Sequence, residues 1–433
     1  MGFDQAALDQ LSKELREPQW LTALRRTAWA RHAKLPWPHP SDDIWRRTDV
    51  TLLDPSKGFA PTQPSLLQSV KVSDAQLTQY MQPLGDERLI VRANGAWLTQ
   101  DRPRDLAVED LARASTGDGR LLRQAIEADG LSDAEQKLTT LNTAFHHDDV
   151  AVQVPAGYTG AQTVRMVRLF SIAGQQAIFP LTIITVGAGS RLTLIDEYVS
   201  LPADGGAQPH LINARIELVL EPGAQLHYVR LQRWGSHARE FLLQRATLAE
   251  GSTLTMANIN LGAALSKAHI VTKLTGPNAS TKLSGFVFGH HAQHIDQHTL
   301  QDHQAPNTTS DLAFRAALQD QSRMIYTGLI RIAKSAKQTN AYQANHNLLL
   351  SEGARAETIP MLEILADDVQ CKHGASIGPI DEEQTFYLMS RGMPRAAAQR
   401  LIVMGFIEPV MQQIPFAPLQ EQLRLEIEGE LHA

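Results

Sequence analysis

A short pattern that recurs through the middle of the chain limits the folds this sequence can adopt. Each copy is a glycine, a small residue and then apolar residues two positions apart, at residues 189–194, 223–228 and 251–256. Asn278 and Ala279 open a fourth, less regular copy. Apolar residues two apart are typical of strands, whose side chains alternate between two faces. Short strands that return every few tens of residues, without helices between them, indicate an all-β stack such as a β-helix or a double-sheet jelly roll.

Helical patterns flank this β region and divide the chain into three parts. Residues 1–150 form a helical and mixed N-terminal region, in which Asn94-Gly95 is typical of a tight hairpin turn. Residues 151–378 form the β core, and residues 379–433 a C-terminal helical region. The expected fold class is therefore mainly β with helical ends.

One uncharged stretch resembles a membrane span in length only. Residues 169–190 hold no charged side chain, but they include two glutamines, Pro180 and Gly187. We interpret them as two buried strands and a turn, because strands fill a core with short apolar runs. The first residues carry acidic and amide side chains where an export signal needs basic and then apolar ones. We therefore expect a cytoplasmic protein that does not bind a membrane.

The composition and the absence of common catalytic motifs exclude several classes of function. The net charge of −6, from 40 basic and 46 acidic residues, argues against a nucleic-acid coat. There is no P-loop, no complete dinucleotide-binding glycine motif, no nucleophile elbow and no H-E-x-x-H sequence. The single cysteine, Cys371, excludes an internal disulfide framework and a four-cysteine metal site within one chain. We predict that the protein is not an enzyme by itself.

A histidine cluster is the first candidate site. Five of the 16 histidines fall within 14 residues: His290, His291, His294, His298 and His303. In an extended segment, the first, third and fourth share one face with Asp296 and Asp302, and the other two point to the opposite face. Imidazoles and carboxylates are suitable metal ligands. No two of these histidines lie two residues apart, so polar residues at a partner surface remain an alternative to a metal site.

Cys371 and His373 form the second candidate site. Because they lie two residues apart on an expected strand, their side chains point the same way and could bind one ion. Two ligands are too few for zinc or for an iron–sulfur cluster, so a metal here would need ligands from another chain. The structural alternative is a buried cysteine beside a hydrogen-bonded histidine.

The C-terminal third resembles the SufB/SufD family of iron–sulfur cluster assembly proteins. The resemblance is carried by residues 356–364, 367–375, 386–392 and 405–406, and extends to 302–303, Ser310, the glutamines after Lys337, 17–21, 45–48 and 94–95. Within the family the chain is most like SufD. Its length and the Trp45-Arg46-Arg47-Thr48 element match SufD, and the β region lacks the further cysteines that SufB-type chains carry.

This resemblance implies a right-handed parallel β-helix in a non-catalytic scaffold subunit of the SufBCD complex. It implies pairing with a SufB-like subunit through the β-helix and docking of a SufC-like ABC-type ATPase on residues 379–433. It further implies a transient nascent iron–sulfur cluster at the shared interface. His373 would contribute to that cluster, Cys371 lies at the neighbouring family position, and His303 is a weaker candidate. The isolated chain would hold no stable cofactor, and a free β-helix edge would also allow a homodimer.

Two other functions fit parts of the sequence. A cupin-like or β-helix metalloenzyme would use the cluster between His290 and His303. A β-helix carbohydrate enzyme is a third candidate, although such enzymes are mostly secreted and the chain shows no export signal.

Overall fold

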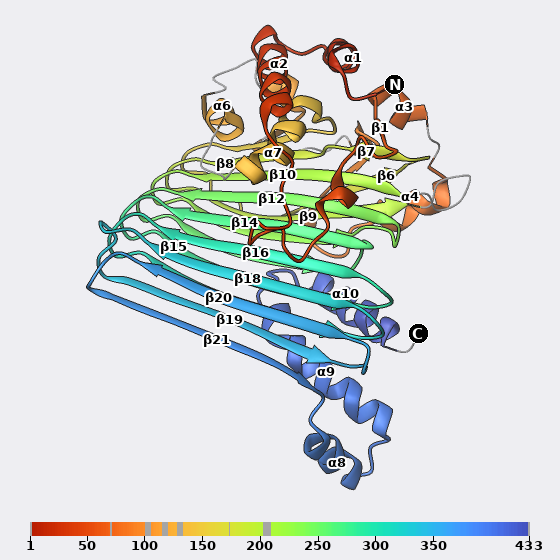
Figure 1. Ribbon diagram of the computed structural model, residues 1–433, viewed down its shortest axis with the longest axis vertical. Coiled ribbons are helices and arrows are strands. Elements are labelled where there is room, and N and C mark those ends of the chain that lie inside the picture. The colour runs from red at the N-terminus through yellow and green to blue at the C-terminus, as the bar shows by residue number, and fades with distance from the viewer. Residues whose placement is uncertain are drawn as a thin grey trace.

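Parallel strands wound alternately into two facing sheets form the centre of the molecule (Figure 1). The computed structural model describes residues 2–69, 72–99, 105–114, 120–127, 133–172, 174–201 and 209–431. From β9 onward, each strand pairs in parallel with the strand two places later in the chain, so consecutive strands alternate between the sheets. This confirms the mainly β fold class and the parallel β-helix, and it rules out the jelly roll, whose strands are antiparallel.

From β5 in sheet A and from β6 in sheet B, the strands on the main path of each sheet follow one another in sequence order. Sheet A contains β4 (Ala107–Glu109), β5 (Val150–Val154), β8 (Leu181–Val186), β10 (His210–Leu220), β12 (Ala238–Leu248), β14 (Leu265–Leu274), β16 (His294–His303), β18 (Arg323–Ile332) and β20 (Arg355–Ile364), with β7 (Gln176–Ile178) and β1 (Ala60–Pro61) beside them. Sheet B contains β3 (Ala96–Trp97), β2 (Glu87–Ala93), β6 (Thr163–Ser171), β9 (Arg191–Leu201), β11 (Gln225–Arg233), β13 (Thr253–Asn260), β15 (Ser280–Gly289), β17 (Thr309–Leu318), β19 (Thr339–Leu349) and β21 (Val369–Pro379).

The repeated glycines occupy one corner of the β-helix. A residue with positive φ stands one or two positions before successive strands of sheet B, at Gly189, Gly223, Gly251, Asn278, Asn307 and Gln338. The first four begin the repeats found in the sequence. The last two, Asn307 and Gln338, have no glycine at the corner, and asparagine tolerates this left-handed conformation better than most residues.

The space between the sheets is filled by columns of apolar side chains. Leu226 of β11 pairs in register with Leu192 of β9 and Leu254 of β13, and all three are buried. Each such leucine contributes roughly 1.5–3 kcal/mol through removal of its surface from water. Near the N-terminal end, Leu106 and Val108 join the same core and close that end of the β-helix.

Helices cover the outer faces of both sheets (Figure 1). They are α1 (Gln5–Leu15), α2 (Gln19–Lys34), η1 (Val50–Leu53), α3 (Pro64–Ser69), α4 (Asp74–Tyr80), α5 (Leu111–Ala114), α6 (Arg120–Glu127), α7 (Asp133–Phe145), α8 (Glu382–Ser390), α9 (Arg395–Met411) and α10 (Ala417–Glu430). Helices α1 and α7 share an apolar cluster with sheet A, while α9 and α10 pack on sheet B. Helix α8 projects beyond the last strands (Figure 1).

Two local predictions are confirmed. The Asn94-Gly95 turn joins β2 to β3, with φ of 47° and 82° at its two residues. The uncharged stretch 169–190 contains the end of β6 and the buried strands β7 and β8. Among the described residues, none of the helices combines the length and the apolar character needed to cross a membrane.

We expect the corner at Gly251 to tolerate asparagine better than alanine. Its φ is +62°, and an added Cβ would meet no atom within 4 Å, so the cost of substitution is conformational. Gly251→Ala should destabilise the protein by about 1–2 kcal/mol, and Gly251→Asn by less than half of that. Urea unfolding followed by circular dichroism measures both. Equal midpoints for the two variants would contradict this explanation of the corner.

Candidate functional site

The C-terminal end of the β-helix is open. Strands β20 and β21 each pair with one neighbour, β18 and β19 respectively, and in the part of the chain that the structure describes no further coil covers them. Leu362 and Ile364 stand in register with Ile330 and Ile332, which are fully buried. The two outer residues are 39% and 41% exposed, because the coil that would bury them is missing.

This open end exposes backbone and apolar surface together. An edge strand presents unpaired N–H and C=O groups that can pair with another chain. Large apolar side chains accompany the edge: Met361, Leu362, Ile364, Leu365 and Ile377 are all exposed. An exposed apolar patch beside a free sheet edge indicates a surface for protein association.

Cys371 and His373 lie on β21 at this open end. They stand in register with Ala341 and Gln343, which are buried inside the β-helix, so both side chains point toward its interior. Cys371 is half-buried and packs against the cluster that holds Ile330. Burial raises the pKa of its thiol, so the thiol form is favoured until a metal or a nearby cation stabilises the thiolate. His373 is exposed.

The pair is incomplete as a metal site. Within the described ranges, no set of three or more histidine, cysteine or carboxylate groups with metal-binding spacing includes Cys371 or His373. A tetrahedral site needs four ligands, so two positions would have to come from another molecule or from solvent.

His303 is held by two hydroxyl groups. Its Nδ1 lies 2.8 Å from Thr308 Oγ1, and its Nε2 lies 2.9 Å from Ser310 Oγ. Burial lowers the pKa of His303 to about 4, so the ring is neutral. The metal role predicted for His303 would require it to give up one of these hydrogen bonds.

The other histidines of the cluster lie on the outer face of β16 or before it. His291 is exposed, and its Nδ1 lies 3.6 Å from Asp320. His298 Nε2 lies 3.1 Å from Asp296, whose other oxygen lies 2.6 Å from Lys267 Nζ. Burial lowers the pKa of His298 to about 4. Because the Lys267 ammonium already balances Asp296, this group needs no metal for charge neutrality.

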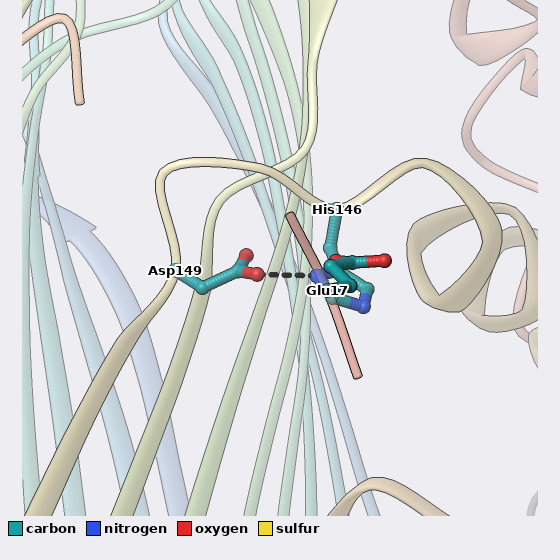
Figure 2. Close-up of side chains that lie close together, drawn as sticks. All are labelled: Glu17, His146 and Asp149. Atoms are coloured by element: carbon teal, nitrogen blue, oxygen red, sulfur yellow. Dashed lines mark hydrogen bonds and ion pairs between the residues drawn. The ribbon is translucent and has the colours of Figure 1, made fainter. Parts of the chain in front are cut away.

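A second titratable cluster, which the sequence patterns did not reveal, lies in the turn between α7 and β5. His146 and Asp149 meet Glu17 there, with ligand atoms within 4.8 Å of one another (Figure 2). Arg25 donates to both carboxylate oxygens of Glu17, and its Nη2 lies 3.0 Å from His146 Nδ1. A buried guanidinium thus supplies the positive charge that a metal would bring.

The same contacts favour the protonated form of Asp149. A guanidinium only donates, so His146 Nδ1 must accept from Arg25. The 2.6 Å contact between that nitrogen and Asp149 Oδ2 therefore needs a hydrogen from the carboxyl group. Burial raises the pKa of Asp149 to about 7, in agreement with this assignment.

We predict that Asp149→Asn changes the pH dependence of stability. A folded-state pKa near 7, against 3.8 in the unfolded chain, means that the folded chain loses stability as pH rises through this window. Asparagine donates the same hydrogen bond without titrating. Its free energy of unfolding relative to the natural chain should therefore rise by roughly 1–4 kcal/mol between pH 4 and pH 8. Asp9→Asn, which removes an exposed carboxylate paired with Arg26, is the control for loss of a carboxylate at the surface, and denaturant unfolding measures both variants. A flat difference for Asp149→Asn would refute the proton assignment.

A second exposed apolar surface lies on the C-terminal helices. Phe386 is 72% exposed on α8, with Tyr387 and Met389 beside it in sequence, and Leu401 is exposed on α9. The opposite side of α9 packs on sheet B through Val403 and Ile407. These side chains therefore present apolar surface away from the packed side of α9.

Comparison with known proteins identifies the family. The model of the SUF system FeS cluster assembly SufBD core domain matches residues 170–406, more than half of the chain. An iron–sulfur cluster assembly SufBD family protein of Synechocystis is 25% identical over 399 residues, covering 89% of this chain and 86% of the relative. SufD of Escherichia coli is 30% identical over 239 residues, covering 55% and 56%. SufB of Bacillus subtilis is 23% identical over 451 residues, covering 99% and 94%. The chain belongs to the SufBD family of iron–sulfur cluster assembly proteins.

Proposed function

We propose that this chain is a scaffold subunit that pairs with a SufB-like protein through the open end of its β-helix. The observation that carries the proposal is the coincidence of three features on one coil. The free edges of β20 and β21, the exposed apolar side chains and the incomplete Cys371–His373 pair all lie there. A partner strand on this edge would bury the apolar surface and bring further ligands to the pair.

In this proposal the iron–sulfur cluster is the cargo of the complex. His373 supplies a ligand to the nascent cluster from one side, and Cys371 stands two residues away on the same face. The partner supplies the remaining ligands, because two protein ligands cannot hold a cluster. The isolated chain then carries no stable cofactor.

We expect His373→Ala to lower cluster formation in the complex by about tenfold or more, as loss of a metal-site group commonly does. Anaerobic reconstitution of the co-expressed complex with iron and sulfide, followed by absorbance and iron analysis, measures the yield. His346→Ala is the control, since His346 lies on the neighbouring strand β19 and bonds only to Ser376. A normal yield with His373→Ala would exclude the ligand role. Cys371→Ala then tests the neighbouring position.

We also propose that an ABC-type ATPase of the SufC kind docks on α8 and α9. The exposed apolar side chains of these helices support this, as does the lack of a P-loop, which leaves nucleotide hydrolysis to another subunit. Because α9 packs on sheet B, movement of the ATPase would reach the β-helix through these helices. ATP-driven motion would then open the interface near His373 to iron and sulfur.

Replacing both Phe386 and Tyr387 by alanine should weaken ATPase binding by about 30-fold, the loss typical of an aromatic anchor. The fold should survive, because both side chains are exposed. Leu425→Ala on α10, at a side chain 61% exposed, is the matched control. Isothermal titration with the purified ATPase measures both. Unchanged affinity in the double variant would move the docking site away from α8.

Within the complex we assign the chain the SufD-like position. The presence of Cys371 as the single cysteine supports this, because a SufB-type chain carries further cysteines in the β region. A metalloenzyme using the histidine cluster is less well supported. Lys267 and the hydroxyls around His303 already satisfy the groups that would bind the metal.

A further inference from the structure

The segment between α2 and η1 crosses the outer face of sheet A as a strap, residues 41–48. Figure 1 shows it in red, descending from α2 across the strands. Trp45 anchors the strap: its ring is buried and lies 5.9 Å from Phe241 of β12 and 5.7 Å from His269 of β14. Lys267 of β14 adds a hydrogen bond of 2.7 Å to the Ile44 carbonyl.

The strap continues toward the open end. Thr48 Oγ1 lies 3.1 Å from His294 Nε2 of β16 and also donates to Asp296. Arg47 Nε donates to Glu357 Oε2 of β20 over 2.9 Å. Glu357 also accepts from Arg323 of β18.

This path bypasses the usual order of contacts in a solenoid. Each coil normally contacts only the coils next to it, so the last coil is supported from one side. Here the N-terminal region contacts β20 directly. Trp45 fixes the strap on β12 and β14, and β16 is the strand of sheet A that separates β14 from β18. Arg47 is the residue that carries this support to the outermost strand, through a side chain 28% exposed.

We propose that Arg47 is a positioning residue for partner docking: through Glu357 it holds the edge strand β20 in place for the incoming protein. This rests on the proposed function of the open end. The guanidinium groups of Arg47 and Arg323 both form ion pairs with the Glu357 carboxylate. Glu357 lies on β20, whose other edge is free. Loosening one of them lets the edge strand fray, and a frayed strand must be ordered again when the partner binds.

Hydrogen exchange of the full-length chain tests the positioning without any partner. Arg47→Gln should speed exchange of residues 355–364 by about two- to fivefold, the loss expected for a partly exposed ion pair. Arg46→Gln is the control, because Arg46 is more exposed and pairs with Asp43 of its own turn. Residues 238–248 of β12 should be unchanged in both. Unchanged exchange of 355–364 in Arg47→Gln would overturn the inference.

Affinity for the SufB-like partner gives the second readout. Arg47→Gln should weaken binding by a similar factor, Arg46→Gln should not, and Glu357→Gln, which loses the pairs with both Arg47 and Arg323, should weaken it at least as much as Arg47→Gln. Faster exchange with unchanged affinity would also overturn the positioning role. If the natural chain bound no partner at all, the proposed function would fail, while the exchange result would still report on the strap.

Discussion

Register between neighbouring coils is the constraint on which the rest of this structure depends. Each strand of the solenoid bonds to the strand one coil before and one coil after it, so identical side-chain positions stack into columns. The ladder can continue only if every coil turns the corner at the same place. A residue in the left-handed conformation makes this turn before the strands of sheet B from β9 to β19, beginning with Gly189 and ending with Gln338. A regular ladder has no internal stop, so its last coil exposes the surface that all earlier coils bury.

The two ends of the ladder therefore differ: the N-terminal end is closed and the C-terminal end is open. At the N-terminal end, Val108 of β4 and the adjacent Leu106 close the core. At the C-terminal end the interior opens on Cys371 and His373, with apolar side chains around them. A solenoid end without a polar cap favours association. Cys371 and His373 thus lie on the last coil, where side chains that face the interior are accessible to a second protein.

Buried ion pairs connect neighbouring strands of the β-helix and link β6 to the turn that precedes β5. Among the described residues, seven buried arginines pair with buried carboxylates: Arg25 with Glu17, Arg92 and Arg168 with Asp148, Arg165 with Glu197, Arg215 and Arg245 with Glu217, and Arg230 with Glu240. Removing one partner of such a pair leaves an uncompensated buried charge, at a cost of about 3–5 kcal/mol. The same demand for neutrality explains why the two acidic and histidine-rich clusters contain Arg25 and Lys267. Both clusters resemble metal sites in residue type and are complete without an ion.

Local sequence patterns determined the β stack and the shared face of Cys371 and His373. Alternating apolar residues and corner glycines predicted the β stack, because strand faces and left-handed turns depend on neighbours in the chain. The spacing of Cys371 and His373 predicted a shared face, and the pairing of β19 with β21 bears that out. Only the tertiary structure decided which face was the interior and which coil was the last. It also decided that Arg47, 310 residues away along the chain from Glu357, reaches the edge strand. This contact depends on how the coils stack and on where the strap crosses sheet A. Neither can be predicted from local sequence patterns.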